Sequence, residues 1–130
     1  MKVKDIAKKY SIDKDSFVDF LVEHKLPVTT HLLSGASVDD AKADFYARLY
    51  KGCKAAARGE YPFTDNQQEE LSIRIGEIIS EGMSEEKLAE FDAIDDSNEA
   101  AKWLRINKPN YARDVAAQTY KIVYEIESKK

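Results

Sequence analysis

Cysteine, proline and glycine are scarce in this sequence of 130 residues, which has one, three and five of them respectively. The single Cys53 has no second cysteine to pair with, which excludes a disulfide-stabilised secreted scaffold and indicates a reducing, cytoplasmic location. Few prolines and glycines leave long stretches free to form helices.

Long hydrophobic runs are also missing. The N-terminus carries Lys2, Lys4 and Asp5 with no continuous apolar segment behind them. A membrane-spanning helix needs about 20 apolar residues, and a signal peptide needs an apolar stretch after its charged start. We therefore expect neither, and no membrane association.

The patterns of known catalytic and metal sites are absent as well. No G-x-x-x-x-G-K-[ST] phosphate loop occurs, and only Cys53 is available to join His24 and His31 in a zinc site that needs three or four ligands. Because no nucleophile and base can be paired either, we expect no enzyme, no cofactor, no catalytic residue and no metal site.

Charge is divided unevenly along the chain. Residues 1–58 hold eleven Lys or Arg against eight Asp or Glu, hence +3, whereas residues 59–130 hold nine against sixteen, hence −7. The first part is suited to contact polyanions and the second part would repel them.

Apolar periodicity predicts helices throughout, and no sustained alternation predicts a strand. Two short helices end before Pro27, an irregular connection follows, and a third helix capped by Ser37 runs toward Gly59. The predicted apolar stripe of that third helix is Val38, Ala41, Phe45, Leu49, Cys53 and Ala56.

Residues 59–63 combine a helix stop, a proline and two aromatics, which indicates a joint. Four further helices with short connections are expected over 64–130. The predicted fold is all-α, with a three-helix unit over 1–58 packed on or joined to a four-helix acidic bundle over 64–130.

Two surfaces are candidates for binding. The first, opposite the stripe of the third helix, is a basic face for RNA or DNA phosphates, or simply solvated charge: Arg48, Lys51, Lys54 and Arg58. The second widens the apolar arc of the last helix into a protein or homodimer interface, or a second buried face: Tyr120, Val123 and Tyr124.

A pattern of apolar and basic residues runs through residues 2–46: Lys2-Val3, Ile6-Ala7-Lys8, Ile12, Phe17, Leu21, Leu26-x-Val28-x-x-His31 and Ala41. This pattern resembles the small N-terminal module of bacterial translation initiation factor two. The resemblance implies a compact three-helix unit that assists RNA or ribosome association. That family has glycines after its first two helices, where this chain has Ser11 and Lys25. The remainder is similar to an uncharacterised helical domain of bacterial proteins.

The sequence thus predicts a noncatalytic bacterial binding module or adaptor that contacts RNA, the ribosome or a protein. The alternative is a helix-turn-helix DNA-binding regulator, whose recognition helix would run from Lys14 to His24. That helix carries Asp15, Asp19 and Glu23, a row of carboxylates that would repel phosphates.

Overall fold

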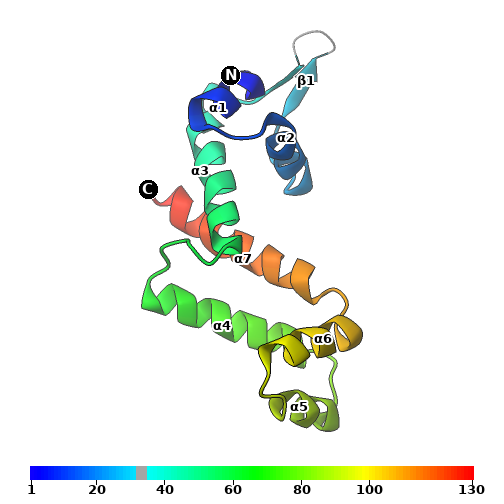
Figure 1. Cartoon of the computed structure of the whole chain (residues 1–130). Coiled ribbons are helices and arrows are strands. Elements are labelled where there is room, and N and C mark those ends of the chain that lie inside the picture. The colour runs from blue at the N-terminus through cyan, green and yellow to red at the C-terminus, as the bar shows by residue number, and fades with distance from the viewer. Residues whose placement is uncertain (32–34) are drawn as a thin grey trace. The chain divides into compact units, whose positions relative to one another are not determined.

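The computed structural model describes residues 1–31 and 35–130, which form two compact units (Figure 1). The first unit comprises Met1–Tyr61 and Val123–Lys130, and the second comprises Pro62–Ile122. In the described residues the regular elements are α1 (Val3–Tyr10), α2 (Lys14–Glu23), β1 (Thr29–His31), β2 (Gly35–Ser37), α3 (Asp40–Ala57), α4 (Asp65–Ser80), α5 (Glu85–Asp92), α6 (Ser97–Asn107) and α7 (Tyr111–Ser128). The predicted all-α class is confirmed.

The core of the first unit forms where α1 and α2 pack on α3. Ile6, Phe17 and Leu49 are fully buried there. The ring of Tyr50 meets Phe17 edge to face, with ring centroids 5.5 Å apart, and Phe20 in the same way at 5.3 Å. Such aromatic contacts add to the burial of apolar area, so these three rings help to hold α2 against α3.

The first two helices end in a left-handed residue that is not glycine. Ser11 has φ 55° and Lys25 has φ 56°. The next amide in each case closes the helix end, Ile12 donating to the Ala7 carbonyl and Leu26 to the Leu21 carbonyl, both at 2.8 Å. Glycine is the usual residue in this conformation because a Cβ makes it strained.

The connection between α2 and α3 is more regular than the sequence indicated. β1 and β2 pair as an antiparallel hairpin in the register Thr29↔Ser37, Thr30↔Ala36 and His31↔Gly35. The prediction of an irregular segment was wrong because strands of three residues are too short to show alternation. Ser37 therefore lies in a strand, and Asp39 caps α3 by accepting from the Ala41 amide at 3.2 Å.

The buried face of α3 also differs from the predicted stripe. Leu49 is buried as expected, but Ala41 is exposed and Phe45 and Cys53 are half-buried. The buried residues of α3 are Ala43, Tyr46, Ala47, Leu49, Tyr50 and Gly52. The arc is wider than a single stripe because α3 is covered both by α1 and α2 and by the end of α7.

Residues 123–130 group with the first unit, not with the acidic bundle over 64–130 in which the sequence analysis placed them. Val123 is fully buried, and it lies against Gly52 of α3. Gly52 has no side chain, which leaves room on α3 for the side chain of Val123. The helix α7 therefore supplies residues to both units.

The second unit is a set of four helices, α4 to α6 and most of α7. Thr64 begins α4 with a capping box, accepting from the Gln67 amide while the Gln67 side chain accepts from the Thr64 amide. The buried side chains of this unit are Leu71, Trp103, Leu104 and Ile122. In the described part of the chain, no helix combines the length and apolar character needed to cross a bilayer.

Candidate functional site

Three exposed lysines of the first unit gather around the end of α1 and the middle of α3. The ammonium of Lys51 donates to the carbonyl of Tyr10 at 3.3 Å, and the Lys9 ammonium lies 5.3 Å from the centre of the Tyr10 ring. Lys54 is one helical turn beyond Lys51, with its ammonium 5.6 Å from the Tyr50 ring centre. We refer to Lys9, Lys51 and Lys54 as the basic surface.

The lysines of the basic surface form no ion pair within the described chain, although the charge of Lys9 contributes to the lowered pKa of Asp44. Among residues 1–31 and 35–130, no carboxylate lies within 4.0 Å of the ammonium groups of these lysines. Arg58, predicted to belong with them, pairs instead with Glu60 at 3.0 Å, and both side chains are exposed. Exposed pairs of this kind are weak, so Arg58 keeps part of its capacity to meet an anion.

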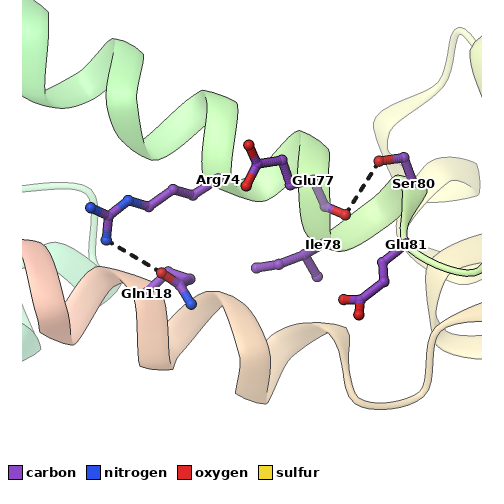
Figure 2. A pocket seen from close by; sticks show the side chains of 6 residues that line it. All are labelled: Arg74, Glu77, Ile78, Ser80, Glu81 and Gln118. Carbon is purple, nitrogen blue, oxygen red and sulfur yellow. Dashed lines mark hydrogen bonds between the residues drawn. The ribbon is translucent and has the colours of Figure 1, made fainter.

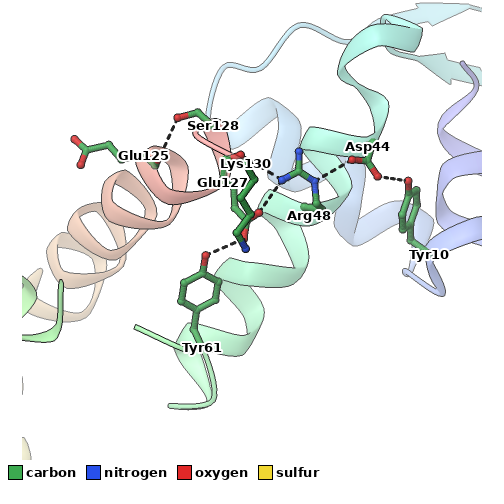
Figure 3. Close-up of polar contacts among 8 residues, drawn as sticks. All are labelled: Tyr10, Asp44, Arg48, Tyr61, Glu125, Glu127, Ser128 and Lys130. Atoms are coloured by element: carbon green, nitrogen blue, oxygen red, sulfur yellow. Dashed lines mark hydrogen bonds and ion pairs between the residues drawn. The ribbon is translucent and has the colours of Figure 1, made fainter. Parts of the chain in front are cut away.

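Arg48, the fourth predicted polyanion contact, lies in an ion-pair network and not on the open face. Its Nε donates to Asp44 at 2.9 Å, and its Nη1 donates to the carboxylate of Glu127 at 2.9 Å (Figure 3). The end of α7 covers part of this side of α3, so Arg48 is paired and only one-third exposed, and its predicted contact with a polyanion stays a prediction.

Glu127 is the centre of this network. It is only 4% exposed, and its carboxylate accepts from Arg48, from the Tyr61 hydroxyl at 2.8 Å and from the Lys130 ammonium at 3.1 Å. Burial alone would raise the pKa of Glu127, but the hydrogen bonds from Tyr61, Lys130 and Arg48 outweigh it and hold the pKa below its usual value. Burial and the Glu127 hydrogen bond raise the pKa of Tyr61. The carboxylate is therefore ionised at neutral pH.

The network continues to α1 through Asp44. The Tyr10 hydroxyl donates to Asp44 Oδ1 at 2.5 Å, and this hydrogen bond, followed by that from Arg48, lowers the pKa of Asp44 (Figure 3). The same hydrogen bond raises the pKa of Tyr10. A continuous polar chain thus joins α1, α3 and α7.

Sequence reasoning did not find Glu127. The available signal was its spacing, since it follows Val123 by four residues and so shares a helical face with a buried side chain. The partner could not be read from the sequence, because Arg48 and Glu127 are separated by 79 positions.

The three residues of the predicted protein interface on α7 do not form one exposed surface. Val123 is 0% exposed and belongs to the core of the first unit, so it is not a surface contact and that part of the prediction was wrong. Tyr124 is 39% exposed and its ring meets Phe45 edge to face at 5.3 Å. Tyr120 is half-buried in the second unit.

A groove of about 540 Å³ lies in the second unit between α4 and α7, as Figure 2 shows. Its lining residues are Arg74, Glu77, Ile78, Ser80, Glu81 and Gln118. Arg74 is held by Glu70 at 2.5 Å and Gln118 at 3.3 Å, and the Ser80 hydroxyl donates to the Glu77 carbonyl at 3.2 Å. The polar side chains of the lining are thus two glutamates, a serine, an arginine and a glutamine.

His24 and Cys53 are packing residues in this structure. The centroid of the His24 ring lies 4.7 Å from that of the Phe20 ring, and burial lowers the pKa of His24. Burial raises the pKa of the Cys53 thiol to about 12, which leaves it un-ionised at neutral pH. Across residues 1–31 and 35–130, no three His, Cys, Asp or Glu side chains are grouped to hold a metal ion. The side chain of His31 lies outside the described set.

Comparison with curated proteins and with solved structures finds no match. A family model described as "Protein of unknown function (DUF5663)" matches residues 54–126. The match covers more than half of the chain, beginning inside α3 and ending inside α7. The chain belongs to the DUF5663 family.

Proposed function

We propose that this protein is a noncatalytic binding module whose first unit contacts the phosphates of RNA through the basic surface. The observation that carries the proposal is that Lys9 and Lys51 both lie at Tyr10, Lys9 over its ring and Lys51 at its carbonyl, with Lys54 one turn further along α3. When lysines without an ion-pair partner neutralise phosphates, counterions condensed on the nucleic acid are released, and this release drives association.

The left-handed helix ends support RNA or ribosome contact as the role of this unit. Ser11 and Lys25 adopt positive φ at the two positions where the initiation-factor module has glycine. After each of the first two helices the backbone of this chain thus adopts the conformation that glycine favours, although the residue itself is not glycine. The hairpin between α2 and α3 is an addition to the expected three helices.

The exposed side of α2 argues for RNA over a helix-turn-helix reading of DNA. Asp15, Asp19 and Glu23 are all exposed on this helix, and Val22 is exposed beside them. A recognition helix lies in the major groove between two phosphate backbones, where three carboxylates would be repelled. No feature of α2 compensates for that repulsion with base-reading cations beyond Lys14 at its first turn.

The second unit in this proposal contacts protein. Residues 62–122 contain thirteen Asp or Glu against seven Lys or Arg, so the unit repels nucleic acid. Ile106 is 75% exposed and Ile73 is 57% exposed, although the unit has few buried side chains of its own. These two side chains are the apolar groups that this proposal offers to the protein partner.

Fluorescence anisotropy of a labelled RNA stem–loop, with duplex DNA of equal length alongside, tests the nucleic-acid part. We expect binding to RNA that weakens as salt is raised, and the double variant Lys51→Glu, Lys54→Glu should weaken it at least about tenfold at 0.1 M salt. For the double variant, the slope of the logarithm of the binding constant against the logarithm of the salt concentration should be smaller in magnitude by about one to two. The reason is that about 0.7 to 0.9 of a counterion is released per phosphate contact.

The matched control is Lys102→Glu with Arg105→Glu on α6. These two exposed residues have the same spacing and the change in net charge is the same, but they lie in the second unit. If both double variants lose RNA binding equally, net charge alone explains the loss. If the Lys51→Glu, Lys54→Glu variant binds RNA as the wild type does, the basic surface is not the binding site.

A further inference from the structure

Resting on the RNA-binding function proposed above, we infer that Glu127 acts as an internal competitor for RNA phosphate: it holds Arg48, a further phosphate ligand, in an autoinhibited state. Arg48 lies on α3 one turn before Lys51 of the basic surface. The guanidinium is one-third exposed, so it borders solvent and is not enclosed.

Glu127 presents to Arg48 the same chemistry that a phosphate would. Its carboxylate oxygen meets Nη1 at 2.9 Å, and its own carbonyl oxygen accepts from the same nitrogen at 3.2 Å. Arginine binds carboxylate and phosphate oxygens with the same planar donors, so the two anions exclude each other from the same guanidinium nitrogen.

Glu127 has two other donors that do not need Arg48, and one of them, Tyr61, lies outside α7. Tyr61 and Lys130 both donate to Oε1, whereas Arg48 is bound through Oε2. Asp44 also holds the guanidinium, at Nε, and would keep it oriented after Glu127 withdrew. If Arg48 leaves, the Glu127 carboxylate keeps its hydrogen bonds from Tyr61 and Lys130. The contact with Arg48 can therefore be displaced without leaving the carboxylate unpaired.

The test compares Glu127→Gln with Glu125→Gln in the full chain, using the same labelled RNA stem–loop. Both variants remove one negative charge from α7, but Glu125 is exposed and makes no side-chain contact with Arg48 in Figure 3. We expect Glu127→Gln to tighten RNA binding about tenfold, the equivalent of one charged hydrogen bond, and Glu125→Gln to change it less than about twofold. Adding Arg48→Gln to Glu127→Gln should abolish the gain.

Hydrogen exchange of the wild-type chain gives a readout that does not depend on how the variants fold. Coupling between two sites is reciprocal, so RNA that competes with Glu127 must loosen the α7 end. Saturation with RNA should lower the amide protection of residues 123–128 and leave that of α4 unchanged. Unchanged or increased protection there, or equal affinity of the two glutamine variants, overturns the autoinhibitory contact.

Failure of the proposed function gives a different result. If neither the wild type nor Glu127→Gln binds RNA at low salt, RNA binding itself is refuted. If the wild type binds through Lys51 and Lys54 while Glu127→Gln gains nothing over Glu125→Gln, RNA binding stands and Arg48 is only a structural ion-pair residue.

Discussion

Gly52 of α3 lies directly against Val123 of α7: a Cβ placed on Gly52 would be 2.9 Å from Cγ1 of Val123. The same Cβ would be 3.0 Å from Cε2 of the Tyr61 ring. No side chain larger than hydrogen fits there without displacement, because Val123 is fully buried and the half-buried Tyr61 is held by its hydrogen bond to Glu127.

Gly52→Ala should therefore lower the free energy of unfolding by about 1 kcal/mol or more, since overpacking of the contact outweighs the gain in helix propensity. Gly76→Ala on α4 is the matched control, because nothing lies within 4 Å of its Cβ position. That variant should be more stable by about 0.5 to 1 kcal/mol. Urea unfolding followed by circular dichroism measures both, and a stabilised Gly52→Ala would show that α7 does not approach α3 this closely.

The stability conferred by Glu127 should depend on pH. Its pKa in the folded chain is lowered, so its contribution is complete above the unfolded value of about 4.3 and is lost as the pH falls through the folded value. At pH 7 we expect Glu127→Gln to be less stable than wild type by about 1 to 3 kcal/mol. The difference should disappear on acidification below pH 4, as the glutamate protonates and comes to resemble glutamine.

Urea unfolding at a series of pH values checks this, with Glu125→Gln as the variant whose stability difference stays flat. A difference for Glu127→Gln that persists undiminished at pH 2 would mean that packing, not charge, is what the substitution removes. Asp44 has a lowered pKa too, but its side chain is 63% exposed and solvent screening makes its share smaller.

Lys25→Gly and Ser11→Gly should each stabilise the first unit, because a side chain in the left-handed region costs about 1 to 2 kcal/mol and glycine does not bear that cost. The greater entropy of glycine in the unfolded chain offsets part of this gain, leaving about 0.5 to 1 kcal/mol. Differential scanning calorimetry should show a higher Tm for each. Gly82→Ala, at φ 71° in the second unit, should show the reverse.

The helices were predictable because each carries its own local signals. Thr64 with Gln67 and Pro27 after the second helix mark boundaries that depend only on neighbouring residues. The hairpin was not predictable, because a strand of three residues is too short to show an alternation of apolar and polar side chains. A threonine such as Thr29 is also found in loops as well as in strands.

The ion-pair network was beyond sequence reasoning for a different reason. Arg48 lies opposite the expected stripe and looked solvated, yet its partner comes from the far end of the sequence. Charge pairs distant in sequence leave no periodic trace, whereas Lys51 and Lys54, which face outward, behave as their spacing indicated.

The residues of the second unit lie in the sequence between two parts of the first, which makes the second unit an insertion. During synthesis, residues 1–61 leave the ribosome long before residues 123–130. The side of α3 that carries Arg48 and Gly52 therefore stays uncovered until the end of α7 has been made. The inserted unit has all of its residues available earlier and is free to fold first. The first unit, although it begins the chain, is then the last to be completed.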